Sequence, residues 1–131
     1  MKKGVDSIIL TRQELQIMKV VWDMGAASVK DVCDAMSQAK PIAYTTILTL
    51  MGILEEKGAL VHSRLGRAFI FRPVLSRRQA TQNQVRDVIC RFYDGCPERL
   101  IEDILENEAL DPEHLETIRG VLDARQVNLV A

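Results

Sequence analysis

The chain has 131 residues, of which 47% are hydrophobic and 27% carry a charge. This length and composition indicate one globular domain with at most a short appendage, and they exclude an intrinsically disordered chain. No stretch approaches the ~20 apolar residues of a transmembrane helix, and the apolar run near the N-terminus is too short for a signal peptide. We therefore expect a soluble, cytoplasmic protein that does not insert into a membrane.

Charge is divided unevenly along the chain, although the net charge is only −1. Residues 1–80 contain 12 Lys and Arg against 7 Asp and Glu, a balance of +5, whereas residues 81–131 contain 5 against 11, a balance of −6. This asymmetry favours an N-terminal part that binds a polyanion and a C-terminal part with another role. A chance distribution of surface charge is the alternative.

The cysteines indicate neither a disulfide framework nor a metal site. The three residues Cys33, Cys90 and Cys96 show no Cys-x-x-C spacing, and the two histidines lie far apart in the sequence. We expect reduced, buried thiols, as in most cytosolic proteins, and we predict no metal and no other cofactor. A thiol- or metal-responsive role for Cys90 and Cys96 is the alternative.

Capping boxes mark the starts of the first two predicted helices. In each box the two residues are three positions apart, so that each side chain can accept a hydrogen bond from the backbone N–H of the other. The two pairs are Thr11 with Glu14 and Ser28 with Asp31. Apolar residues recur at helical spacing after each start, and Gly25 is suited to end the first helix.

A third helix is predicted from about Ala43 to Lys57, between a break at Pro41 and a stop at Gly58. No residue before it offers a convincing side-chain cap. One face of this helix is apolar and consists of Ile47, Leu50, Met51 and Leu54. The other face is small or hydroxyl-bearing, and it consists of Thr45, Thr49, Gly52 and Glu56, with Thr46 and Ile53 towards its edge.

Two short runs with strand character follow the third helix. Leu60–Arg64 and Arg67–Arg72 flank the dipeptide Leu65-Gly66, a spacing that predicts a β-hairpin with a two-residue turn. Pro73 is suited to end the second strand.

Three further helices are predicted in the acidic part of the chain. Ser76 with Gln79 forms a capping box, Pro97 suits the first turn of a helix, and Asp111-Pro112 starts the last one. Their wide apolar stripes cannot all be covered within one small monomer, so we expect pairing with a second copy; folding back on the N-terminal part is the alternative. The candidate dimerisation residues are Val88, Ile89, Phe92, Leu100, Ile101, Ile104, Leu105, Leu115, Ile118 and Leu122.

The order of helix, helix, helix and hairpin is typical of a winged helix-turn-helix. We therefore expect a mainly α fold, with a winged helix-turn-helix N-terminal domain at residues 6–75 and a small helical dimerisation domain at residues 76–126. In this geometry the recognition helix, about residues 43–57, enters the major groove of duplex DNA, and the wing, residues 60–72, reaches the phosphates or the minor groove.

Threonines on the third helix suit base recognition, because a threonine can donate or accept a hydrogen bond and can pack its methyl group on thymine. Thr45, Thr46 and Thr49 are predicted to read bases, whereas Tyr44 and nearby cations are predicted to contact the DNA backbone. The candidate DNA-binding residues are Lys30, Lys40, Ala43, Tyr44, Thr45, Thr46, Thr49, Arg64 and Arg67.

A winged helix that binds only proteins, with no affinity for DNA, is the main alternative function. We do not expect an enzyme, because no nucleophile has a His or Asp partner at the spacing of a catalytic motif. His114, which lies near Glu113 and Glu116, is predicted to be a surface residue rather than a metal ligand.

Four segments together carry a resemblance to a known family: residues Leu10–Trp22, Ala43–Ile47 (AYTTI), Leu54–Gly58 (LEEKG) and Gly66–Pro73 (GRAFIFRP). Over about residues 6–125 the sequence resembles the penicillinase-repressor (BlaI/MecI) family. The resemblance implies a homodimeric transcriptional repressor that binds a dyad-symmetric operator through its winged helix and dimerises through its helical C-terminal domain.

The resemblance also bears on regulation. In characterised relatives a membrane sensor-peptidase triggers cleavage of an Asn–Phe bond. Alignment puts Asp103 and Ile104 at the place of this bond, so these two residues form the candidate cleavage site. The resemblance also makes a membrane sensor-peptidase a candidate partner. Copper-responsive relatives carry Cys-x-Cys pairs, which this sequence lacks, so copper sensing is not expected. Many relatives have a basic residue where Ile53 stands, which implies one DNA contact fewer here.

Overall fold

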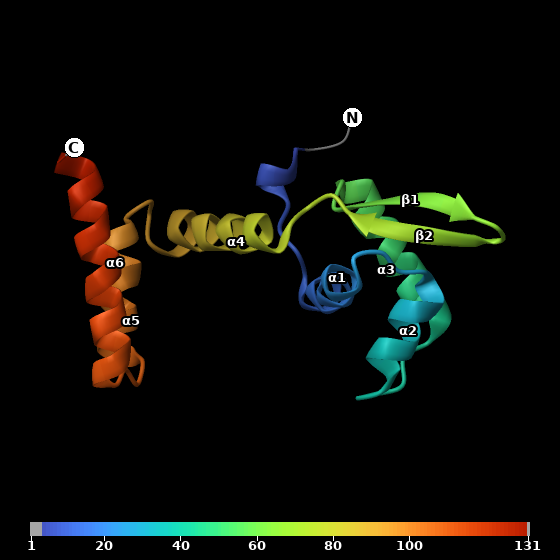
Figure 1. The fold of residues 1–131 in the computed structure, drawn as a ribbon, viewed down its shortest axis with the longest axis horizontal. Helices are drawn as coiled ribbons and strands as arrows, with labels where there is room; N and C mark the ends of the chain where they lie inside the picture. The colour runs from blue at the N-terminus through green and yellow to red at the C-terminus, as the bar shows by residue number, and fades with distance from the viewer. Residues whose placement is uncertain (1–3, 131) are drawn as a thin grey trace. The chain divides into compact units, whose positions relative to one another are not determined.

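The structure is a computed structural model that describes residues 4–130, with side chains described up to residue 126. It is mainly helical with one antiparallel two-stranded sheet (Figure 1), which confirms the predicted fold class. The chain divides into two compact units, Met1–Asp87 and Val88–Ala131. Its elements in chain order are η1 (Val5–Ser7), α1 (Arg12–Met24), α2 (Val29–Ser37), α3 (Tyr44–Lys57), β1 (Leu60–Leu65), β2 (Ala68–Pro73), α4 (Arg77–Phe92), α5 (Pro97–Asn107) and α6 (Pro112–Val130).

The predicted capping boxes are all confirmed. The Glu14 backbone N–H donates to Thr11 Oγ1 at 3.2 Å, and the Thr11 N–H donates to Glu14 Oε1 at 2.8 Å. Ser28 and Asp31 make the same reciprocal pair at the start of α2, and Ser76 with Gln79 makes it just before α4. Local hydrogen bonding therefore fixes where these helices begin, because each box satisfies backbone donors that the helix itself leaves free.

The hydrophobic core of the first unit lies where α1, α2 and α3 meet the base of the hairpin. The apolar stripe predicted for α3 is confirmed, since Ile47, Met51 and Leu54 are fully buried and Leu50 is half-buried. Burial of this stripe holds α3 against its neighbours and leaves its opposite face free. The largest fully buried side chains are Ile17, Met18, Ile47, Met51, Leu54, Leu60, Leu75, Val21 and Val32.

The hairpin exists as predicted, but the predicted position of its turn is wrong by one residue. Leu65 pairs with Ala68, so the two turn residues are Gly66 and Arg67 rather than Leu65 and Gly66. Gly66 has a φ of +63°, and a glycine with positive φ at the first central position is the requirement of a type II′ turn. The shift places Arg67 in the turn itself.

The hairpin is attached to the helices by backbone hydrogen bonds at its base. The Phe71 N–H donates to the Ala27 carbonyl at 2.8 Å, and the Ala27 N–H donates to the Phe71 carbonyl at 3.0 Å. Ala27 lies between α1 and α2, and Phe71 is buried on β2. This bridge fixes the start of the wing while its tip projects beyond the helices (Figure 1).

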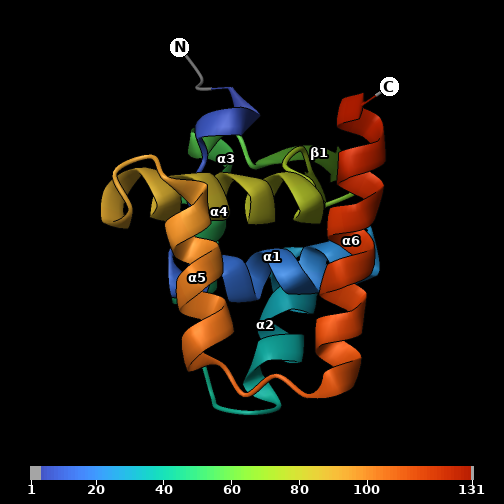
Figure 2. The same cartoon turned by 90° about the vertical axis from the view of Figure 1, so that its left-hand side faces the viewer.

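The second unit has no core of its own. Its helices α5 and α6 run in opposite directions (Figure 2) and make almost no close backbone contact with each other. None of residues 88–126 is buried, and Phe92 is 71% exposed. In the part of the chain that the structure describes, no helix combines the length and the apolar character needed to cross a lipid bilayer.

Candidate nucleic-acid interface

The C-terminal end of α3 is fixed by an ion pair with α1. Lys57 Nζ donates to Glu14 Oε1 at 2.6 Å, and Glu14 is only 2% exposed. Burial on its own would raise the pKa of Glu14, but hydrogen bonds from Lys57 and Thr11 outweigh it and lower the pKa below the usual 4.5. The charged carboxylate is therefore the stable form in the folded protein. At the other end of α3, Ala43 is the N-cap and makes no side-chain cap bond, as predicted.

From Tyr44 to Ile53 the free face of α3 carries only uncharged side chains, and the exposed carboxylate of Glu56 follows near the end of the helix. Thr45, Thr46 and Thr49 are all exposed, and Tyr44 is 51% exposed at the start of the helix. A Cβ built on Gly52 would meet nothing within 4 Å, so this position leaves the helix backbone open to close approach. The face can therefore lie against a flat, hydrogen-bonding surface.

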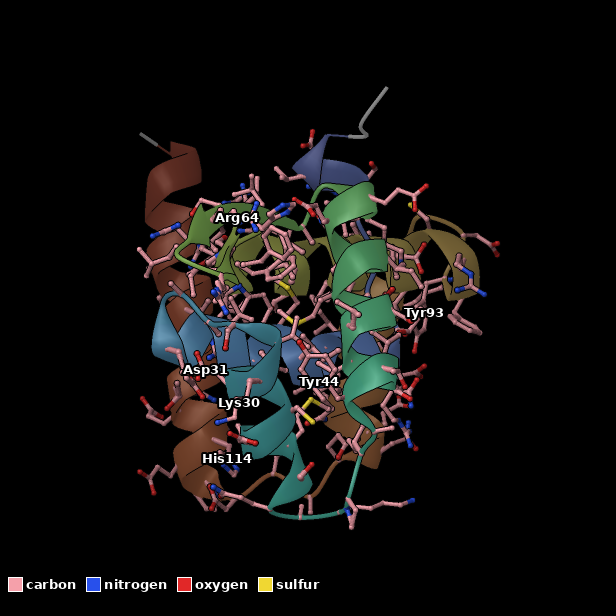
Figure 3. The ribbon with its side chains drawn as sticks, turned by 90° about the vertical axis from the view of Figure 1, so that its right-hand side faces the viewer. Lys30, Asp31, Tyr44, Arg64, Tyr93 and His114 are labelled. Carbon is pink, nitrogen blue, oxygen red and sulfur yellow. The ribbon has the colours of Figure 1, made fainter. Side chains whose placement is uncertain are left out.

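Cations surround this face. Lys30 lies at the start of α2, Lys40 lies in the connection before α3, and Arg64 and Arg67 lie at the tip of the wing. Figure 3 shows Lys30, Tyr44 and Arg64 on the same side of the first unit, coming from α2, α3 and β1. All four cations are exposed, and none of them forms an ion pair within residues 4–126. A helix face that is uncharged from Tyr44 to Ile53 and is flanked by cations without ion pairs suits the grooves and phosphates of duplex DNA.

A family model described as penicillinase repressor matches residues 10–124. The chain belongs to the penicillinase repressor family. Membership makes it a DNA-binding transcriptional repressor and not an enzyme.

Individual relatives of this family are similar over most of the chain. The penicillinase repressor of Bacillus licheniformis is 28% identical over 110 residues, which cover 84% of this chain and 86% of that protein. The methicillin resistance regulatory protein MecI of Staphylococcus aureus is 21% identical over 116 residues, which cover 88% and 94%. A solution structure of the DNA-binding domain of the repressor BlaI superposes with a TM-score of 0.52 and 32% identity, covering 60% of this chain and 93% of that one.

This penicillinase-repressor family member also places a residue beside the α3 face that the sequence alone did not single out. Gln13, on the first turn of α1, lines a shallow hollow of about 320 Å³ together with Thr45, Thr46, Thr49 and Leu50. A glutamine amide can both donate and accept hydrogen bonds, so Gln13 extends the polar surface of α3. Only the tertiary packing of α1 on α3 brings it there, and no local signal marks it.

Two exposed apolar side chains on α3 were also not predicted as site residues. Leu48 is 46% exposed and Ile53 is 38% exposed. Both lie on the free side of the helix, outside the buried stripe formed by Ile47, Met51 and Leu54. The signal for Leu48 was present in the sequence, because it falls one turn after Tyr44 and outside the apolar spacing of the core residues.

The wing is braced against the end of α3. The His62 backbone N–H donates to Glu55 Oε2 at 3.1 Å, and His62 Nδ1 lies 2.7 Å from Glu55 Oε1. The His62 ring also packs edge-on against Phe69, with the ring centroids 4.9 Å apart. These contacts join the hairpin to the C-terminal part of α3.

The cysteines differ in part from the expectation. Cys90 is exposed, so the prediction of buried thiols is wrong for this residue, whereas Cys33 and Cys96 are half-buried. Cys90 lies in the last turn of α4, within residues 88–126, where no side chain is buried. Among residues 4–126, no three His, Cys, Asp or Glu side chains lie close enough together to hold a metal ion.

Most candidate dimerisation residues present apolar surface to solvent. Phe92, Ile101, Ile104, Leu105, Leu115 and Leu122 are between 40% and 71% exposed. The others, Val88, Ile89, Leu100 and Ile118, are half-buried.

The candidate cleavage bond lies inside a helix. Asp103 and Ile104 belong to α5, and Asp103 Oδ2 accepts a hydrogen bond from the Tyr93 hydroxyl at 2.6 Å. This hydrogen bond to the carboxylate raises the pKa of Tyr93. His114 is exposed and its Nδ1 lies 3.2 Å from Asp111 Oδ1 at the start of α6.

Proposed function

We propose that this repressor acts as a homodimer that binds a dyad-symmetric operator, with one α3 in the major groove of each half-site and each wing at the DNA backbone or minor groove. The observation that carries the proposal is the exposed face of α3, which is uncharged from Tyr44 to Ile53 and is flanked by exposed cations that form no ion pair within residues 4–126. These cations are Lys30, Lys40, Arg64 and Arg67. Nucleic-acid binding of this kind combines phosphate neutralisation by cations with base recognition by a helix.

Residue roles follow from this placement. Thr45, Thr46 and Thr49 read base edges, because their hydroxyls and methyl groups match groups in the major groove. Tyr44 contacts the sugar-phosphate backbone at the start of α3, and Ala43 allows the N-terminus of the helix to approach a phosphate. The cations of α2 and of the wing neutralise phosphates on either side.

Dimerisation through residues 76–126 is supported by the lack of a core in the second unit. No side chain between residues 88 and 126 is buried, although large apolar side chains such as Phe92 and Leu122 are present. Helices that cannot bury their apolar faces alone gain stability from a symmetric copy. The balance of −6 over residues 81–131 also keeps this part away from DNA phosphates.

Gel retardation with genomic DNA fragments at low salt tests the proposed function. We expect retarded fragments, and we expect purified protein to sediment as a dimer. Failure to retard any fragment in dilute buffer, with the protein folded by circular dichroism, would contradict DNA binding and favour a winged helix that binds proteins only.

A further inference from the structure

The first three turns of the recognition helix lack every side chain that reads a purine with two hydrogen bonds. Between Tyr44 and Leu54 there is no Arg, Lys, Asn, Gln, His, Asp or Glu. Guanine is read most often by Arg or Lys, and adenine by Asn or Gln, through paired hydrogen bonds in the major groove. On this stretch of α3, only threonine hydroxyls, apolar groups and the Tyr44 phenol remain for base recognition.

The apolar group best placed for this role is Leu48. It lies on the free side of α3, one helical turn after Tyr44 and Thr45 and one turn before Gly52. It is 46% exposed, because it lies outside the buried stripe formed by Ile47, Met51 and Leu54. No side chain covers the helix backbone at Gly52, one turn further on, since a Cβ built there would meet nothing within 4 Å.

The major groove displays one apolar group, the C5-methyl of thymine, and it is the partner that an exposed leucine fits. We propose that Leu48 is a specificity-determining residue that selects thymine by packing on this methyl group. This inference rests on the proposed function. It states that each half-site contains thymine opposite Leu48. It also states that no side chain of residues 44–54 reads a purine through paired hydrogen bonds.

Operator selection followed by methyl removal tests the proposal. The full-length protein selects binding sites from a pool of random duplexes, and each thymine of the selected site is then replaced by deoxyuridine, which lacks only the methyl group. At the position opposite Leu48 we expect the affinity of the wild-type protein to fall about fourfold per half-site. This is the factor expected when the burial of one methyl group is lost. Replacement at other thymines should have smaller effects.

Leu48→Ala should remove most of this sensitivity, so that thymine and uracil at that position are bound within about 1.5-fold of each other. Leu65→Ala is the matched control, since Leu65 is 70% exposed at the end of β1, next to the wing turn. The minor groove and the phosphates carry no methyl group. The Leu65→Ala variant should therefore keep the wild-type ratio of the affinities for the thymine and uracil duplexes. Leu48→Asn should shift the preference at the same position from thymine towards adenine.

The outcomes separate the inference from the proposed function. If no duplex is selected at all, the proposed function itself fails. If duplexes are selected but uracil is bound as well as thymine at every position, or if Leu48→Ala keeps the wild-type ratio, DNA binding stands and the role of Leu48 is overturned.

Discussion

Lys57, the last residue of α3, donates a hydrogen bond of 2.6 Å to the buried carboxylate of Glu14 in the first turn of α1. The same ammonium group donates to the Ile9 carbonyl at 3.4 Å. The Glu14 carboxylate also completes the capping box of α1 through the Thr11 N–H. One side chain therefore supports both the start of α1 and the end of α3, and with them the face that we propose binds DNA.

Replacing Glu14 by Gln should lower the free energy of unfolding by about 1–2 kcal/mol at pH 7, because the charged hydrogen bond from Lys57 is lost. The Lys57 side chain is 34% exposed, which keeps the effect below that of a fully buried pair. Since the folded-state pKa of Glu14 is lowered, its stabilisation is complete above the unfolded value near 4.5 and disappears as pH falls through the folded pKa. Urea unfolding of both proteins from pH 7 to pH 3 measures the difference. Glu56→Gln, an exposed change on α3, serves as the control, and a difference independent of pH would contradict the account.

Replacing Asn83 by Ala should destabilise the first unit by about 2–3 kcal/mol. Asn83 is 5% exposed, and its Nδ2 donates to the Val5 carbonyl at 2.6 Å and to the Ile8 carbonyl at 3.0 Å. Its loss leaves these carbonyls without that donor and frees the segment before α1. Chemical denaturation with hydrogen exchange near η1 measures both effects. Asn107→Ala, which removes an exposed side-chain bond, should change stability by less than about 0.5 kcal/mol.

Replacing Arg67 by Ala should weaken binding to all DNA sequences alike. The loss of one phosphate contact should reduce the slope of log K against log salt by about 0.9 per protomer. Fluorescence anisotropy over a range of salt concentrations measures the slope. Arg99→Ala, which removes an exposed arginine from α5, is the matched control, and an unchanged slope for Arg67→Ala would exclude a phosphate contact at the wing tip.

Replacing Thr45 by Val should change base preference more than overall affinity, because valine keeps the shape of threonine and removes its hydroxyl. We expect discrimination at one base position to fall about fivefold, the value of one hydrogen bond of about 1 kcal/mol. Competition between duplexes that differ at single positions measures it. The control is Thr117→Val on α6, where the hydroxyl donates to the Glu113 carbonyl, and it should leave all base preferences unchanged. If Thr45→Val lowered the affinity for every duplex equally, base reading by Thr45 would be contradicted.

The sequence predicted the features that depend on local chemistry. The capping boxes at Thr11, Ser28 and Ser76 form as expected because a box needs only residues three positions apart. The buried stripe of α3 was predictable from helical spacing for the same reason. The turn of the wing was misplaced by one residue, because Gly66 could occupy either central position of a two-residue turn and only the strand register decides between them.

The features that the sequence did not predict depend on contacts between distant residues. Lys57 and Glu14 are 43 positions apart, and Gln13 reaches the α3 surface only through packing of α1 on α3. Leu48 was overlooked because an apolar residue in a helix is expected in the core, although its position outside the stripe of Ile47, Met51 and Leu54 was a signal in the sequence. The exposure of Cys90 was also not predicted, because it depends on which side chains the tertiary structure buries.

The central claim is that two protomers bind one operator, each placing α3 in a half-site about one helical turn, ~10 base pairs, from the other. Sedimentation velocity of the protein with a selected duplex measures the mass of the complex directly. The account predicts two protomers per duplex. A complex with one protomer per duplex, or the absence of any complex in dilute buffer, would contradict it.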